Sequence, residues 1–199
     1  KNLMVLTCDV STSAGLDRFR KTLPEQYIDL GIAEQNLIGV ATGLSSEKFD
    51  VITTTFAPFQ TMRCCEQIKV NLGYMSHKVC MVGLASGLAL GTLGFTHSCI
   101  EDIGVLRSIP GITIISPADS LETIKALDAA VKSNGPCYIR LTGTSNTPLR
   151  NLCNRSRTTQ GFANRPKRKT PPRRRDRRLR TKSYSFCCFC LLRRRKKKN

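Results

Sequence analysis

Histidine is scarce in this sequence: only two of its 199 residues are histidines, His77 and His97. Neither lies near the three clustered cysteines of the C-terminal segment, which are Cys187, Cys188 and Cys190. Structural zinc sites combine cysteine and histidine ligands, so this scarcity argues against a zinc site. We therefore expect that the chain itself holds no metal ion.

A secretory leader is also missing. The chain opens on Lys1 and Asn2 without a methionine, which indicates a fragment of a longer protein. Ten cysteines are present, and Cys8, Cys80 and Cys137 lie in apolar runs, where cysteine acts as a small buried hydrophobic side chain. Unpaired cysteines are typical of a reducing compartment, so we expect a cytoplasmic protein.

No charged residue interrupts the chain from Val79 to Phe95. Four glycines fall in this stretch, which are Gly83, Gly87, Gly91 and Gly94. Their spacing matches the G-x-x-x-G pattern of membrane helix dimers, but the stretch is short for a span and a poor isolated helix. A buried parallel strand followed by a glycine-rich loop explains it better, so we expect no membrane segment.

Charge is divided unevenly along the chain. Residues 1–149 contain 12 Lys and Arg against 13 Asp and Glu, a net charge of −1, whereas residues 150–199 contain 20 against one, a net charge of +19. The first segment is long enough for one domain, whereas the second has the composition of a disordered segment. We predict one domain over residues 1–148 and a disordered basic tail over residues 149–199.

Three interpretations of the basic tail stay open. Clustered Arg and Lys could bind nucleic acid by neutralising phosphates, or could contact anionic membranes. The tail could also be a non-native continuation, such as the product of a shifted reading frame. The abrupt change in composition favours the last interpretation, so we do not expect nucleic acid as a partner.

Apolar runs alternate with amphipathic stretches along the first segment. The expected strands are Leu3–Thr7, Tyr27–Leu30, Val51–Phe56, Val79–Leu84, Ile112–Ile115 and Cys137–Leu141. The expected helices are Asp17–Leu23, Glu34–Ser46, Pro58–Leu72, Ser98–Ser108 and Asp119–Lys132. This alternation predicts a doubly wound α/β domain, with a parallel sheet of about six strands and helices on both faces.

Ligands of such folds bind beyond the carboxyl ends of the strands. Glu34 lies there, in the first turn of a helix, where the helix dipole alone would favour a carboxylate. Phe56 and Phe59 follow the next strand and would also pass as core residues at a strand-to-helix junction. Together, one acid beside two rings could hold and protonate a flat heterocycle.

Five motifs extend this pattern, and they occur at Gly31–Asn36, Thr55–Phe59, Gly94–His97, Glu101–Ile103 and Ser116–Asp119. In their type and order the chain resembles the pyrimidine-binding domain of transketolase, from about Leu3 to Pro148. It is most similar to the split bacterial and archaeal form, in which this domain belongs to the C-terminal subunit. The resemblance implies a thiamine diphosphate enzyme of carbohydrate metabolism that transfers two-carbon ketol units between sugar phosphates.

The resemblance also implies roles for single residues. Glu34 matches the glutamate that shares a proton with N1′ of the cofactor's aminopyrimidine. Phe56 and Phe59 match the aromatic residues packed on that ring, and Met62 falls at a third ring-contact position. Arg63 follows Met62, and we expect it first to form a salt bridge.

Two further residues have matches in the family. His97 matches the histidine of the Gly-x-x-Thr-His motif, which contacts substrate and shuttles protons, although a loop histidine can also lack any role. Ser13 matches a serine that contacts phosphate, and a simple turn residue explains it equally well. Glu34 and His97 are thus the candidate catalytic residues.

Several groups of the family are absent. Its aspartate before the histidine falls at Leu93, its second histidine at Ala85 and its phosphate-gripping arginine at Gly143. There is no Gly-Asp-Gly…Asn run, which in the family holds magnesium and the diphosphate on a separate domain. We therefore expect a diphosphate-binding partner subunit, in a homodimer or a heterotetramer. The alternative is a catalytically inactive remnant that keeps the fold as a dimerisation module.

Overall fold

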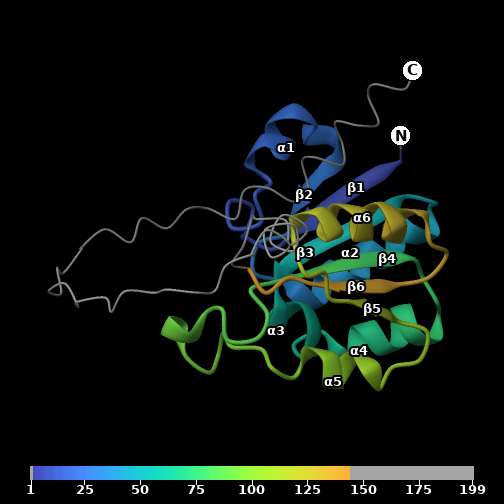
Figure 1. The fold of residues 1–199 in the computed structure, drawn as a ribbon. Helices are drawn as coiled ribbons and strands as arrows, with labels where there is room; N and C mark the ends of the chain where they lie inside the picture. Colours follow the sequence, from blue (N-terminus) through green and yellow to red (C-terminus); the bar gives the residue numbers. More distant parts are fainter. Residues whose placement is uncertain (1, 144–199) are drawn as a thin grey trace, which may run out of the picture.

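The computed structural model describes residues 2–143, so the predicted basic tail lies outside the described residues. Six strands form one parallel sheet in the order β2-β1-β3-β4-β6-β5 (Figure 1). They are β1 (Leu3–Thr7), β2 (Tyr27–Asp29), β3 (Asp50–Phe56), β4 (Val79–Leu84), β5 (Thr113–Ile115) and β6 (Cys137–Arg140). The predicted doubly wound α/β fold with about six strands is confirmed.

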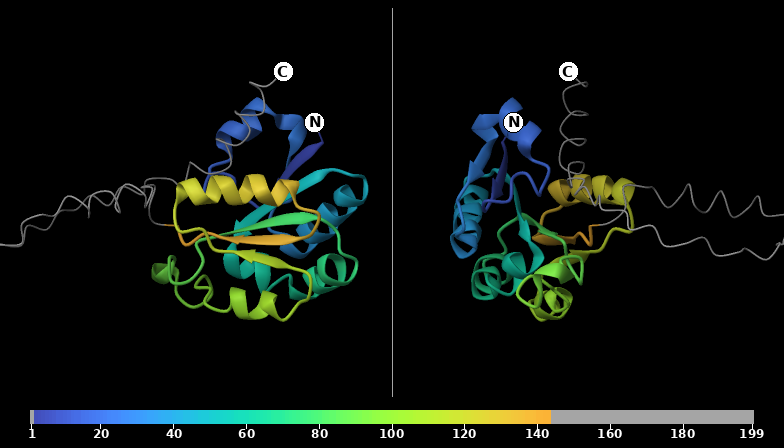
Figure 2. Two further views of the ribbon diagram at one scale, coloured as in Figure 1. Left: turned by 45° about the vertical axis from the view of Figure 1, so that its right-hand side comes forward. Right: turned by 90° about the vertical axis from the view of Figure 1, so that its left-hand side faces the viewer.

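Helical segments connect the successive strands. They are α1 (Asp17–Thr22), η1 (Pro24–Gln26), α2 (Glu34–Ser46), α3 (Ala57–Thr61), α4 (Cys65–Gln67), η2 (Ile68–Tyr74), η3 (Gly91–Leu93), α5 (Asp102–Arg107) and α6 (Ser120–Lys132). The helices α1 and α6 cover one face of the sheet, and α2, η2 and α5 cover the other (Figure 2). Connections that step in one direction along the sheet use one face and those that step back use the other, as right-handed crossovers require.

Alternation along the strands divides the core into two layers. Leu3 and Val5 of β1 pack on the side of α1 and α6, whereas Met4 and Leu6 pack on the side of α2. Because side chains alternate between the faces of a strand, a continuous apolar run fills both layers at once. The charge-free stretch from residue 79 is used in this way as β4 and is followed by a loop, as predicted. Among residues 2–143, no helix is long and apolar enough to span a membrane.

The single helix that we predicted from Pro58 to Leu72 is divided into α3, α4 and the π-helical η2, so that prediction was wrong. Side chains at the division compete for backbone carbonyl groups. The Thr61 hydroxyl donates to the carbonyl oxygen of Ala57 at 2.7 Å, and the Cys64 thiol donates to that of Phe59 at 3.1 Å. Such local hydrogen bonds offer the backbone an alternative to a regular helix.

The helix predicted from Ser98 begins only at Asp102. The backbone of Cys99 is held elsewhere, because it exchanges two hydrogen bonds with Gly87, of 2.7 and 2.8 Å. Of the three side chains predicted to share a buried face, only Leu106 is buried, whereas Ile100 is 67% exposed and Ile103 39% exposed. The exchanged hydrogen bonds tie the segment after His97 to the loop that follows β4.

Candidate active site

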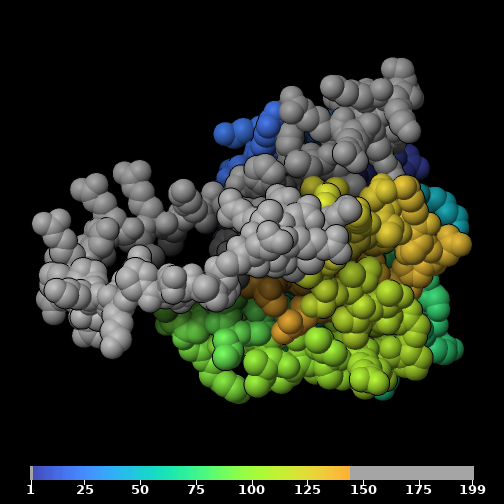
Figure 3. All heavy atoms as spheres, viewed as in Figure 1, coloured from blue at the N-terminus to red at the C-terminus, as the bar shows by residue number. Residues whose placement is uncertain are grey.

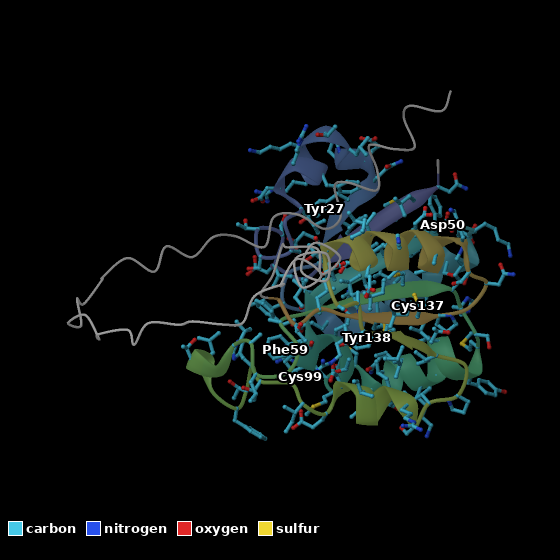
Figure 4. The ribbon with its side chains drawn as sticks, viewed as in Figure 1. Tyr27, Asp50, Phe59, Cys99, Cys137 and Tyr138 are labelled. Atoms are coloured by element: carbon cyan, nitrogen blue, oxygen red, sulfur yellow. The ribbon has the colours of Figure 1, made fainter. Side chains whose placement is uncertain are left out.

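The carboxyl ends of all six strands lie at one edge of the sheet, because every pair is parallel. Phe59 lies at this edge, and Asp50, where β3 begins, lies at the opposite end (Figure 4). At the same edge the chain leaves the neighbouring strands β1 and β3 toward opposite faces. Such a change of direction is where open α/β sheets bind ligands.

Glu34 opens α2 and is only 4% exposed. Its Oε2 atom accepts a hydrogen bond from Nη1 of Arg63 at 2.8 Å. The side chain of Arg63 is 42% exposed, so a buried carboxylate is paired with a guanidinium that water reaches. The pair confirms Arg63 as a salt-bridge residue.

Three predicted site residues form a cluster of rings. The ring centroids of Phe59 and His97 are 5.3 Å apart, and those of Phe56 lie 6.3 Å from both. All three pairs are edge-to-face, which is a favourable arrangement for aromatic rings. The guanidinium carbon of Arg63 lies 4.0 Å from the centroid of Phe59 and thereby connects the rings to Glu34. The structure thus brings Glu34, Phe56, Phe59 and His97 together.

The loop conformation around His97 presents its imidazole to the two phenylalanines. Gly94 has φ 77°, a left-handed value that favours glycine, and its carbonyl oxygen accepts from the backbone N–H of His97 at 3.2 Å. The Nδ1 atom lies 3.0 Å from the Thr96 hydroxyl oxygen, and either group can donate, depending on the tautomer. The imidazole therefore has a polar neighbour on one side and rings on the other.

Two other predicted residues lie apart from these contacts. Met62 follows α3 and is 45% exposed. Ser13 lies in the turn between β1 and α1 and is partly buried. Within residues 2–143, no hydrogen bond joins Ser13 to Glu34, His97 or the phenylalanines, so the roles of Ser13 and Met62 stay predictions.

Asp29 organises the site, and our sequence analysis missed it. Its Oδ1 atom accepts from the backbone N–H groups of Asp9 at 2.9 Å and Gly31 at 3.0 Å, and its Oδ2 accepts from the Tyr27 hydroxyl at 3.1 Å. Asp9 and Gly31 have left-handed φ values of 52° and 66°. One carboxylate thus fixes the loop after β1 and the turn that leads to Glu34. An acid on the last residue of a strand, two residues before a glycine, was the available signal.

Two buried thiols lie close enough to Glu34 to sense its charge. Burial raises the pKa of Cys8 to about 11, and burial together with the Glu34 carboxylate raises the pKa of Cys64 to about 12. Both residues are therefore neutral thiols near pH 7, and neither is a ready nucleophile. Cys8, Cys80 and Cys137 are at most 4% exposed, as predicted for small buried hydrophobic side chains.

A second buried carboxylate, Asp102, lies in the motif Glu101–Ile103. Its Oδ2 atom accepts from the Tyr138 hydroxyl at 2.9 Å and from Nε of Arg140 at 2.8 Å. Burial, and next the Asp102 carboxylate, raise the pKa of Tyr138, so this phenol stays protonated. In the part of the chain that the structure describes, no group of three His, Cys, Asp or Glu side chains could hold a metal ion.

These features define a doubly wound α/β domain whose carboxyl edge combines one buried acid with a cluster of rings. The sequence profile described as the transketolase pyrimidine-binding domain matches residues 1–147. The chain therefore belongs to the transketolase pyrimidine-binding domain family. Membership implies thiamine diphosphate as the cofactor.

Individual relatives agree with this membership. One of the two apulose-4-phosphate transketolase subunits of Phocaeicola vulgatus is 38% identical over 71% of this chain and 45% of its own length. The 6-deoxy-6-sulfo-D-fructose transketolase subunit of a Clostridium species is 35% identical, over 70% of this chain and 43% of its own. A solved structure described as a split-gene transketolase, inactive β4 tetramer, matches with a TM-score of 0.65 and 36% identity, over 74% and 46% of the two chains. The chain thus spans less than half the length of these relatives.

Proposed function

We propose that the chain is the pyrimidine-binding half of a transketolase-like enzyme that moves two-carbon ketol units between sugar phosphates. The observation that carries this proposal is the buried carboxylate of Glu34, connected through Arg63 to the rings of Phe59, Phe56 and His97. Thiamine diphosphate supplies a nucleophilic carbon that no amino-acid side chain provides.

The residues at this edge fit the aminopyrimidine end of the cofactor. A carboxyl group that is only 4% exposed can share a proton with a ring nitrogen away from competing water. Phe56 and Phe59 present ring surfaces for stacking beside that carboxyl group. In this proposal, Glu34 holds the proton at N1′, the phenylalanines orient the pyrimidine, and His97 contacts the substrate and moves its proton.

A diphosphate-binding partner subunit completes the proposed site. Apolar side chains at this edge are exposed to an unusual degree, which are Ile32 at 78%, Met62 at 45%, Leu88 at 73%, Leu93 at 55% and Phe95 at 86%. The loop after β4, which carries three of them, is drawn in green in Figure 3. Exposed apolar side chains grouped around a polar site favour a surface that another protein covers. The partner would bring the magnesium and the diphosphate site, in a homodimer or a heterotetramer.

The sugar substrate is less constrained by the chain. The names of the two relatives above refer to apulose 4-phosphate and to 6-deoxy-6-sulfo-D-fructose, so relatives of similar identity act on different sugars. Leu93, Ala85 and Gly143 stand where the family has polar groups for sugar phosphates. Ala85 is only 3% exposed and has φ 51°, so its backbone is already committed to an unusual conformation. These positions favour a substrate pocket with fewer charged contacts.

The same three positions favour a second candidate function, a catalytically inactive subunit that keeps the fold for assembly. The two candidates differ in the ketol transfer that they predict. The wild-type chain would be mixed with its diphosphate-binding partner, thiamine diphosphate, magnesium and a ketose phosphate donor. Turnover supports the enzyme, and no turnover by an assembled complex supports the inactive subunit.

Replacing Glu34 by Gln tests the catalytic assignment directly. The amide keeps the shape of the side chain but cannot give up or share a carboxyl proton, so we expect ketol transfer to fall by about 10²- to 10⁴-fold. Assembly with the partner should persist, as measured by sedimentation. Glu47→Gln, at the exposed end of α2, is the matched control and should keep full activity. Full activity of Glu34→Gln would refute the assignment.

A further inference from the structure

Arg63 makes two contacts at once inside the candidate site. Its Nη1 atom donates to Oε2 of Glu34 at 2.8 Å, and its guanidinium carbon lies 4.0 Å from the ring centroid of Phe59. The first contact satisfies the one buried acid of the ring cluster, and the second covers an aromatic face. The side chain reaches both from the short connection between α3 and α4.

These are the same two contacts that an aminopyrimidine would need here. A guanidinium and an aminopyrimidine protonated at N1′ are both flat, and both present N–H donors in the plane of the group. Each can stack on an aromatic face while donating to a carboxylate at its edge. A ring bound to Glu34 and stacked on Phe59 in this way would therefore take the place of the guanidinium.

We infer that Arg63 is an internal competitor for the pyrimidine site, which must leave Glu34 and Phe59 before the cofactor's ring can bind there. The inference rests on the proposed function for the identity of the ligand. It adds a regulatory feature to this site: the affinity for the cofactor is reduced by the fraction of molecules in which Arg63 is engaged.

The position of Arg63 allows this exchange. Its side chain is 42% exposed, whereas that of Glu34 is 5% exposed, so the guanidinium can turn into water while the carboxylate stays in place. An ion pair with one exposed partner and a single cation–π contact are both weak, so their loss is readily offset by a bound ring. Gln35 donates from Nε2 to the backbone carbonyl oxygen of Arg63 at 3.1 Å, which holds the backbone there while the side chain moves.

The competition can be tested with thiamine, which carries the aminopyrimidine without the diphosphate. Thiamine would be titrated into the full chain, and the two imidazole signals would be followed by NMR, with His77 as the internal reference for His97. We expect Arg63→Met to bind thiamine about tenfold more tightly than wild type, since both competing contacts are lost. Arg63→Lys keeps the charge without the flat stacking group, so its affinity should be intermediate.

Matched variants separate this effect from a general change of charge. Arg107→Met removes an exposed arginine from the end of α5 and should leave the thiamine affinity unchanged. In the double variant Glu34→Gln/Arg63→Met the tenfold gain should disappear, because the ring has lost its carboxylate. Equal or weaker thiamine binding by Arg63→Met would overturn the inference.

An arm without ligand distinguishes failure of this inference from failure of the proposed function. Unfolding of wild type, Glu34→Gln, Arg63→Met and the double variant in urea gives the coupling between the two side chains. Coupling without thiamine binding by any variant would overturn the pyrimidine site and, with it, the competition. Thiamine binding that Arg63→Met leaves unchanged would overturn the competition alone and leave the proposed function standing.

Discussion

Gly83 of β4 faces the largest fully buried side chain of the neighbouring strand β6. A Cβ atom at this position would lie 2.3 Å from the Tyr138 hydroxyl oxygen and 2.7 Å from a carbon of its ring. Tyr138 cannot easily withdraw, because its hydroxyl is bonded to the buried Asp102. The missing side chain of Gly83 is therefore what admits the tyrosine.

Replacing Gly83 by Ala should destabilise the fold by roughly 1–3 kcal/mol, the usual cost of overpacking a core. The measurement is the free energy of unfolding from urea titrations. Gly43→Ala is the matched control, since a Cβ there meets nothing within 4 Å inside α2. Helix propensity predicts that this control is stabilised by up to about 1 kcal/mol. Equal stabilities for the two variants would contradict the packing argument.

At the scale of single residues, the sequence was sufficient where a motif names the residue. Glu34, Phe56, Phe59 and His97 were predicted and lie in one connected cluster. The pairing of Arg63 with Glu34 could not be predicted, because it joins residues 29 positions apart through the packing of two helices. The role of Asp29 is of the same kind, since its bond to Asp9 spans 20 positions.

Among the elements, α6 is bounded by side chains that can be identified in the sequence. Asp119 is its N-cap, and its Oδ1 atom accepts from the backbone N–H of Glu122 at 2.8 Å. The Glu122 carboxylate in turn accepts from the backbone N–H of Ala118 at 2.8 Å. These reciprocal bonds satisfy two donors that the first helical turn leaves without partners.

Asp119→Ala should destabilise the domain by about 1 kcal/mol, because the cap is lost while the helix remains. Thermal unfolding followed by circular dichroism would measure the change. Asp128→Ala is a suitable comparison on the same helix, since its exposed pair with Lys132 contributes at most a few tenths of a kcal/mol. A larger loss for Asp128→Ala than for Asp119→Ala would speak against the cap.

Elements were predictable where local signals agree. The bounds of α2 were predicted to the residue and those of α6 within one residue, because an apolar period and a start signal coincide. The segment from Pro58 to Leu72 was not, because hydrogen bonds from Thr61 and Cys64 divide it. The start of α5 was also missed, since the bridge between Gly87 and Cys99 depends on a distant contact.

Over the whole molecule, the buried thiols couple stability to alkaline pH. In the folded protein the pKa of Cys8 is raised to about 11 and that of Cys64 to about 12, against an ordinary value of 9. Between these values the unfolded chain has lost thiol protons that the folded chain still holds. Stability is therefore complete below pH 9 and falls as the pH rises toward 11–12.

We expect the free energy of unfolding to fall by roughly 3 kcal/mol or more between pH 8 and pH 11, which urea titrations at a series of pH values would measure. The double variant Cys8→Ala/Cys64→Ala should show a flatter dependence over the same range. Cys65→Ala, at a partly exposed position, is the control and should leave the steepness unchanged. A slope that is the same in all three proteins would rule out the thiols as its cause.

The architecture was the most predictable feature, because continuous apolar strands alternating with helices leave few alternatives to a parallel sheet with two helical layers. The domain limit at residue 148 and the basic tail lie beyond what the structure tests, so both stay predictions.

The sheet ends on both sides in strands of only three residues, β2 and β5. So short an edge offers few free backbone groups to an incoming chain. It is therefore a poor template for fibril growth, even though apolar side chains lie open at the carboxyl ends of the strands. Recruitment of another protein would then depend on side-chain shape, which discriminates between partners, and not on backbone pairing, which accepts almost any extended peptide.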